Sequence, residues 1–397
     1  MAPEREPERA SGDRDPDDRG WDRARLLPGV NAAVETPAVA GPVRSWNEWD
    51  PLEEVIVGRL EGATVPTRHV TFEGNLPPVP ARLYRPLAGR HYPRIVVQRA
   101  QRELDGFIRL LESEGIVVRR PDVVDFAVPC STPSWTSRGF CIASPRDGLI
   151  VIGDEIIEVP MAWRSRHFEM RAYRTLLREY FALGARWTSA PRPRLLDSLY
   201  SGDDFRPSPA GEPIRYIVNE SELVFDAADF ARCGRDLFVT RSNVTNQTGI
   251  EWLRRHLGDG FRIHEVETLC RQPMHIDTTF VPLAPGKVLI NPEYADASRL
   301  PSILRSWDVL VAPDPDPIPG FLNVHLSLVS KWISMNMLML DERRVVVEAS
   351  QKSMHRKLRE WGFEPIPCPF MNYKLFGGGF HCATLDIRRR GELRSYF

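Results

Sequence analysis

The chain has 397 residues, a formal net charge of −1 at pH 7 and an ordinary share of hydrophobic residues. It is long enough to bury a large core, and length alone would suggest two or three domains. The near-neutral charge gives no reason to expect a nucleic-acid partner or an anionic membrane, and no apolar stretch is long enough for a membrane span.

The first 43 residues differ in composition from the rest. Residues 1–20 are almost entirely Pro, Arg, Asp, Glu, Gly, Ser and Ala, which cannot bury enough apolar surface to fold. This segment lacks the apolar core of a secretory signal and is too acidic for a mitochondrial transit peptide. We therefore expect residues 1–43 to form a disordered tail. The six cysteines are scattered without metal-binding spacing, which is typical of a cytoplasmic protein.

From residue 44 onward, one pattern of strand, strand, helix and strand returns five times. In chain order, the predicted strands lie at residues 52–58, 116–119, 140–144, 149–152, 223–226, 236–240, 261–266, 278–283, 287–291, 308–312, 332–340, 344–348 and 363–369, with an extended segment at Trp187. The predicted helices lie at residues 99–114, 165–183, 248–257, 297–307 and 350–361. The first copy contains only one strand before its helix, with a long irregular insertion between them.

Five copies of one ββαβ unit, without close sequence identity, predict a single α/β domain of radially repeated modules over residues 44–397. Each module leaves one face uncovered until its neighbours close the ring. A generic α/β sandwich is the alternative, since periodicity alone does not distinguish the two.

Chemically active residues recur at the inner ends of different modules. They are Asp147, Asp226, His275 with Asp277, and Cys382, which follows three consecutive glycines and a histidine. Taken singly, each has a structural explanation: Asp226 could cap a short helix, and Cys382 could be a small buried hydrophobe. Together they predict an acidic pocket that contains a base and a thiol. Such a pocket suits a guanidinium group, whose planar N–H donors match carboxylates.

Six stretches carry a resemblance to one enzyme family: residues 160–166, 225–230, 249–257, 274–277, 334–342 and 377–391. They resemble the arginine amidinotransferases, which include the glycine amidinotransferases of creatine synthesis and the inosamine-phosphate enzymes of streptomycin-type pathways. The resemblance extends over nearly all of residues 45–396. It implies a five-bladed pentein propeller, a homodimer, and a role in bacterial antibiotic or other specialised-metabolite biosynthesis.

The resemblance also implies roles for individual residues. Cys382 is similar to the family's nucleophile, His275 to its general acid and base, and Asp226 to the carboxylate that orients this histidine. Asp147 and Asp277 match the acids that bind the donor guanidinium. The implied reaction moves the amidino group of L-arginine through an amidino-cysteine to a primary amine and releases ornithine. It requires no metal and no organic cofactor.

Four further positions are expected to bind substrate: Met274, Gln272, Tyr294 and Ser330. Tyr294 stands where the glycine enzymes have a carboxylate-binding arginine, and a tyrosine supplies no positive charge. Val329 and Ser330 replace paired serines, and Gln272 replaces an asparagine. We therefore expect an amino sugar, an aminocyclitol or a diamine such as lysine as acceptor, in preference to glycine.

Three alternatives stay open on the sequence alone. An arginine deiminase-like hydrolase of the same fold would pass the amidino group to water. A glycine amidinotransferase proper would keep glycine as its acceptor. A catalytically silent protein would bind guanidino compounds without turning them over.

Overall fold

The computed structural model describes residues 41–76, 84–202, 204–318 and 328–397. The predicted disordered tail lies outside these residues except for its last three positions, of which Val43 is buried. The described residues belong to one compact unit. Among them, no helix combines the length and the apolar character that are needed to cross a membrane.

Five three-stranded sheets share one topology. In each, the middle strand pairs antiparallel with one neighbour and parallel with the other. With the middle strand second, the sheets are β17 (Thr384–Arg389), β1 (Leu52–Val57) and β2 (Val117–Arg119); β5 (Leu149–Ile152), β6 (Glu155–Glu158) and β7 (Arg186–Ser189); β8 (Phe230–Cys233), β9 (Asp236–Val239) and β10 (Arg262–Glu265); β11 (Phe280–Ala284), β12 (Lys287–Ile290) and β13 (Asp308–Val311); β14 (Leu338–Met339), β15 (Arg344–Glu348) and β16 (Glu364–Cys368). A separate short hairpin joins β3 (Cys130–Ser131) to β4 (Thr136–Ser137).

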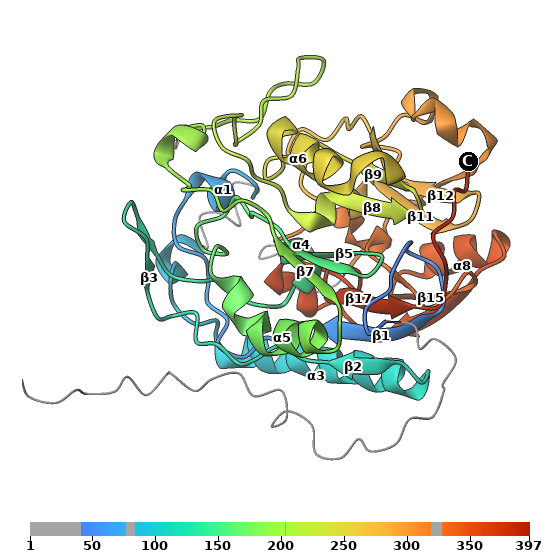
Figure 1. Ribbon diagram of the computed structural model, residues 1–397, viewed down its shortest axis with the longest axis horizontal. Helices are drawn as coiled ribbons and strands as arrows, with labels where there is room; N and C mark the ends of the chain where they lie inside the picture. The colour runs from blue at the N-terminus through green and yellow to red at the C-terminus, as the bar shows by residue number, and fades with distance from the viewer. Residues whose placement is uncertain (1–40, 77–83, 203, 319–327) are drawn as a thin grey trace, which may run out of the picture. The chain divides into compact units, whose positions relative to one another are not determined.

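Helical segments connect the middle strand of each sheet to its parallel neighbour, as is usual for a crossover between parallel strands. In four sheets the connection contains an α-helix: α3 (Arg94–Ser113), α5 (Arg174–Ala182), α6 (Gln247–Leu257) or α8 (Lys352–Glu360). These helices lie around the outside of the sheets in Figure 1. The shorter helices are α1 (Val70–Glu73), α4 (Pro145–Gly148) and the 3-10 turns η2 (Arg85–Leu87), η3 (Glu169–Tyr173), η4 (Asp197–Leu199), η5 (Ala227–Asp229), η6 (Gly258–Gly260), η7 (Ile276–Thr278), η8 (Ala297–Arg299), η9 (Ser302–Ser306), η10 (Lys331–Met335) and η11 (Tyr373–Phe376).

The mixed α/β class is as predicted, but the closed ring stays a prediction. The five sheets are separate hydrogen-bonded units, and no closed sheet joins them within the described part of the chain. The first sheet is completed by the end of the chain, because β17 supplies the antiparallel partner of β1. This strand was absent from the predicted first copy, and it carries the segment after Cys382 into the first sheet.

The first strands of two sheets were predicted too early. In the structure, a two-residue turn that begins at Gly153 joins β5 to β6, and one that begins at Gly234 joins β8 to β9. Both glycines have positive φ angles, of 64° and 70°, which the tight turns of two-residue hairpins favour. Residues 140–144 and 223–226 therefore form connecting segments instead of strands.

Two predicted helices and one predicted strand also differ. Residues 297–307 form two 3-10 turns, because Pro301 cannot continue a helix and holds Leu300 extended. In the stretch from 165 to 183, the α-helix begins only at Arg174, after the 3-10 turn η3. Residues 332–335, which were predicted to begin a strand, belong to the 3-10 turn η10.

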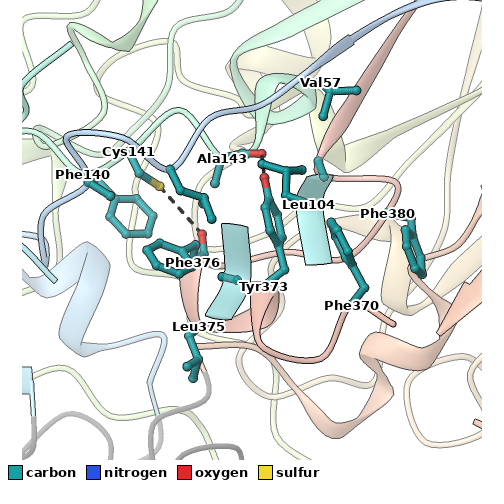
Figure 2. Packing of buried hydrophobic residues seen from close by; sticks show 14 of the residues in the cluster. Val57, Leu104, Phe140, Cys141, Ala143, Phe370, Tyr373, Leu375, Phe376 and Phe380 are labelled. Atoms are coloured by element: carbon teal, nitrogen blue, oxygen red, sulfur yellow. Dashed lines mark hydrogen bonds between the residues drawn. The ribbon is translucent and has the colours of Figure 1, made fainter. Parts of the chain in front are cut away.

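An aromatic cluster supports the segment that leads to Cys382 (Figure 2). The ring of Phe370 stacks on Tyr373, with 4.3 Å between centroids. The hydroxyl of Tyr373 donates to the carbonyl of Ala143 at 2.6 Å, and the thiol of Cys141 donates to the carbonyl of Phe376 at 3.8 Å. Burial of several aromatic rings is a large apolar contribution to stability, so this cluster fixes the backbone immediately before the glycine loop.

Candidate active site

A cavity of about 500 Å³ brings most of the predicted site residues together. Its wall includes Asp147, Gln272, Met274, His275, Asp277, Tyr294, Ser330 and Cys382. Asp226 is not on the wall and lies behind His275, to which it is hydrogen-bonded. The cavity is therefore lined by carboxylates, an imidazole and a thiol from the segments that precede β5, β11 and β17.

The three glycines before Cys382 are each required by the local geometry. Gly377 has a φ of +94°, a conformation that residues with a Cβ rarely adopt. A Cβ on Gly378 would lie 2.5 Å from the Cβ of Cys382, and one on Gly379 would lie 2.8 Å from Oδ1 of Asn336. The loop can thus fold tightly against Asn336 and place Cys382 in a turn two residues before β17.

The side chain of Asn336 holds the thiol of Cys382. Its amide donates to Sγ at 3.0 Å and to Oδ2 of Asp277 at 2.7 Å, and its carbonyl accepts the backbone N–H of Cys382 at 3.1 Å. Sγ also lies 3.3 Å from Oδ2 of Asp277. Burial and the charges of Asp277 and Asp147 raise the pKa of Cys382 to about 12, against the opposing effect of His275.

His275 lies between two carboxylates. Its Nε2 is 3.1 Å from Oδ2 of Asp226, and its Nδ1 is 3.8 Å from Oδ1 of Asp147. Burial alone would lower the pKa of His275, but the charge of Asp147 and the hydrogen bond to Asp226 raise it well above its ordinary value. The φ of His275 is +64°, a strained conformation for a side chain with a Cβ. Strain of this kind is typical of positions where function fixes the direction of a side chain.

A buried arginine neutralises part of this negative charge. Arg166 donates to Oδ2 of Asp147 at 2.7 Å and forms a bidentate pair with Glu169. The other oxygen of Asp147, Oδ1, is buried and has no hydrogen-bond partner in the structure. Burial raises the pKa of Asp147, although His275 and Arg166 oppose the shift. Asp147 therefore offers one occupied and one open carboxylate oxygen.

A second chain of polar groups extends away from Asp277. Its Oδ2 is 3.0 Å from Nδ1 of His381, whose Nε2 is 3.3 Å from Oε2 of Glu48. Burial alone would raise the pKa of Glu48, but Arg232 and Arg146 hold it well below its ordinary value. Both arginines also pair with the buried Asp386, at 2.7 Å each. This buried network fixes the position of His381, directly before Cys382.

Comparison with known proteins gives a consistent result. The chain is 49% identical over 366 residues to an L-arginine:L-lysine amidinotransferase of Pseudomonas savastanoi pv. phaseolicola, covering 91% of this chain and 99% of that protein. It is 45% identical over 376 residues to a mitochondrial glycine amidinotransferase of Xenopus laevis, covering 91% and 86% of the two chains. This chain belongs to the arginine amidinotransferase family.

The likeness extends to three dimensions. The amidinotransferase of saxitoxin biosynthesis from Microseira wollei superposes with a TM-score of 0.86 at 53% identity, covering 90% of this chain and 100% of that one. No protein-family model matches the chain. The protein is therefore an amidinotransferase with the α/β fold of that family.

Sequence reasoning missed three residues of this amidinotransferase that contact predicted ones, namely Arg166, Asn336 and His381. It also missed Glu48, which contacts His381. Arg166 and Asn336 lie inside the stretches that carry the family resemblance, and His381 directly precedes Cys382. Their positions were thus visible in the sequence. Their partners were not, because Glu48 and His381 are 333 positions apart in the chain.

Among the described residues of the amidinotransferase, one cluster has the proximity that a metal site needs. Ligand atoms of Asp147, His275 and Cys382 all lie within 4.8 Å of one another. A thiolate and an imidazole are ligands that soft divalent cations prefer. The same proximity serves proton transfer to and from a nucleophile. That the reaction uses no metal or cofactor stays a prediction.

A pH titration of the free amidinotransferase tests the environment of Cys382. Because burial and two carboxylates raise its pKa to about 12, the thiol should stay protonated where an ordinary cysteine, with a pKa of about 8.5, has ionised. Ultraviolet absorbance of the thiolate, taken as the difference between wild type and Cys382→Ser, should show no ionisation of Cys382 below about pH 9. A thiolate already present in the free enzyme at neutral pH would contradict this electrostatic account.

Proposed function

We propose that the protein transfers the amidino group of L-arginine, through a covalent amidino-cysteine at Cys382, to a primary amine and releases ornithine. The observation that carries this proposal is the meeting of Cys382, His275 and Asp147 within 4.8 Å in one cavity whose wall also contains Asp277. A nucleophile, a proton carrier and carboxylates for a cationic substrate are the groups that amidino transfer needs.

Asp147 and Asp277 are proposed to bind the donor guanidinium. The open Oδ1 of Asp147 is a buried acceptor that makes no hydrogen bond, although Nδ1 of His275 lies 3.8 Å away, and such an oxygen is costly unless a donor reaches it. A guanidinium supplies planar N–H donors and a positive charge that match this need. Its charge would also offset the two carboxylates that raise the pKa of Cys382. Binding of arginine would therefore favour the thiolate when the electrophile is in place.

In the first half-reaction, Sγ of Cys382 forms a bond to the guanidinium carbon of arginine. The C–N bond to the side chain then breaks, and the departing amine takes a proton and leaves as ornithine. The raised pKa of His275 keeps its imidazole protonated, so that it can supply this proton. The thiol proton of Cys382 restores the proton lost by His275. Asp226 is proposed to hold the imidazolium in orientation through its 3.1 Å hydrogen bond.

In the second half-reaction, the acceptor amine attacks the carbon of the amidino-cysteine, and the C–S bond breaks. The acceptor loses one proton, which returns through His275 to Cys382 and regenerates the thiol. Asp147 and Asp277 hold positive charge on the carbon in both steps, where electrostatic stabilisation is most effective. Every proton is accounted for by these side chains and the two substrates.

The acceptor is proposed to be an amino sugar, an aminocyclitol or a diamine such as lysine. The cavity of about 500 Å³ has room for molecules of this size. Tyr294 lies on its wall, and its hydroxyl interacts with Ser330 and Cys270 in place of a charged group. Gln272, also on the wall, is tied to the backbone carbonyl of Gly74 at 2.7 Å. The name of the relative from Pseudomonas savastanoi, which specifies lysine, agrees with a longer acceptor.

Glycine is expected to be a poor acceptor. A charge-assisted hydrogen bond is worth about 1.5–3 kcal/mol, and its absence at Tyr294 weakens binding of a small carboxylate about 10- to 150-fold. Glycine has little besides its carboxylate to bind with, so it should lose more than a larger amine. Measuring kcat/KM for glycine against a panel of amino sugars, aminocyclitols and diamines tests this. Glycine ranking first would overturn the assignment.

The proposal extends to the assembly, location and pathway of the protein. All six cysteines are free thiols in the structure, which favours a reducing cytoplasm. We propose a five-bladed arrangement of the sheets, since the five sheets share one topology. We also propose a homodimer that acts in bacterial specialised metabolism, as the family resemblance implies. The saxitoxin-pathway relative supports a biosynthetic context.

One incubation separates transfer from its alternatives. Arginine is supplied with a panel of amines, and ornithine, citrulline and guanidinylated products are measured by mass. Ornithine together with a guanidinylated amine supports the proposal. Citrulline formed from arginine alone would instead indicate a hydrolase, and arginine binding without any product would indicate a silent binding protein.

A further inference from the structure

Three cationic side chains line the cavity in the described part of the chain besides His275: Arg166, Lys331 and Arg271. Arg166 is neutralised by Asp147 and Glu169. Lys331 is paired with Glu293. Arg271 differs from both, because no carboxylate pairs with it among the described residues.

Arg271 is held in place by neutral oxygens. Nε donates to the carbonyl of Ser208 at 3.0 Å, and Nη2 donates to the carbonyls of Glu212, at 2.7 Å, and Pro209. A carbonyl oxygen fixes the orientation of a guanidinium but carries no formal charge to offset it. Nη1 takes part in none of these bonds. The side chain therefore combines a fixed position with an uncompensated charge at the cavity wall.

Arg271 lies within reach of a substrate that extends along the cavity from His275. It lies four residues before His275 on the same segment, so their Cα atoms are at most about 14 Å apart, and both line the cavity. The carboxylates Asp147 and Asp277 define the end of the cavity that attracts a cation. An amino-acid substrate that binds there by its guanidinium or side-chain amine carries its own negative charge at the opposite end.

We infer that Arg271 is the binding residue for the α-carboxylate of an amino-acid substrate. The inference rests on the proposed function, because it assumes that arginine or another amino acid occupies the cavity. Tyr294 and Ser330, on the same wall, offer hydroxyl groups without charge. Arg271 thus supplies the positive charge that Tyr294 lacks, and it selects substrates that carry a carboxylate over the corresponding simple amines.

Binding to an inactive background tests this without turnover. In Cys382→Ser, dissociation constants are measured by calorimetry for arginine and agmatine, which differ only in the carboxylate. The same measurement with lysine and 1,5-diaminopentane covers the acceptor. Arg271 should favour the carboxylate-bearing member of a pair about 10- to 150-fold. Adding Arg271→Met should remove that preference and leave the affinity for the simple amine nearly unchanged.

Lys331→Met in the same background is the matched control, since it removes a cavity-lining cation that Glu293 already neutralises. If Arg271→Met removes the preference for arginine over agmatine, the inference is supported for the donor. If it removes the preference for lysine over 1,5-diaminopentane, the inference is supported for the acceptor. A preference that survives Arg271→Met in both pairs, or that depends on Lys331 instead, would overturn it. Failure of the proposed function is seen in a different experiment, the incubation of the wild type with arginine and amines, in which no guanidinylated product would then form.

Discussion

Replacing Cys382 by serine is expected to abolish amidino transfer and to leave the fold intact. Removal of a catalytic nucleophile costs on the order of 10⁶ in kcat in a well-studied protease, and a fall of at least about 10⁴ is expected here. A hydroxyl keeps its proton near neutral pH, whereas a thiol can ionise when a cationic substrate offsets the neighbouring carboxylates. Steady-state formation of ornithine measures the loss, and circular dichroism checks the fold.

Cys368→Ser is the matched control for this variant. Burial raises the pKa of Cys368 to about 12, as it does for Cys382. Cys368 lies in β16, outside the cavity wall. The Cys368→Ser variant should therefore keep the transferase activity of the wild type. Retention of more than a few percent of the activity in Cys382→Ser would show that the covalent route is wrong.

Replacing Asp226 by asparagine is expected to lower turnover by about 10⁴-fold, the loss found for the orienting carboxylate of a comparable triad. The imidazolium of His275 would lose its counter-charge and its preferred orientation in both half-reactions. Asp226 does not line the cavity, so arginine should still bind. Single-turnover release of ornithine, measured beside the dissociation constant of arginine, separates the two effects.

Asp229→Asn provides the comparison for Asp226. Asp229 is also buried, and its Oδ2 accepts hydrogen bonds from Ser242 and Thr245, at 2.7 and 2.5 Å. It has no hydrogen bond to His275, so its replacement should slow turnover far less. Asp226 stands at the N-cap position of η5, but its side chain makes no capping hydrogen bond to that turn. If Asp226→Asn turned over normally, the role of orienting His275 would have to be assigned elsewhere.

The sequence predicted which residues meet in the cavity better than it predicted the bounds of the strands. Cys382, His275, Asp147 and Asp277 all line one cavity, and each lies in a segment that precedes a strand of the repeated unit. The hairpins at Gly153 and Gly234 were misplaced, since apolar runs on either side of each turn satisfy the strand pattern equally well. Local periodicity carries no information on which run is paired.

The polar supports around the site could not have been predicted. Arg232 pairs with Glu48 across 184 positions, and Arg146 pairs with Asp386 across 240. Buried ion pairs of this kind depend on how the sheets approach one another, which no local pattern encodes. The antiparallel partner of β1 was missed for the same reason, because β17 lies at the other end of the chain.

The most direct test of the account is the mass of the enzyme after incubation with arginine in the absence of an acceptor. If ornithine leaves and the amidino group remains on sulfur, the protein should gain the mass of one amidino group. Peptide mapping should locate it on Cys382, and addition of an acceptor amine should remove it. An unmodified protein that nevertheless forms guanidinylated product at full rate would contradict the covalent mechanism.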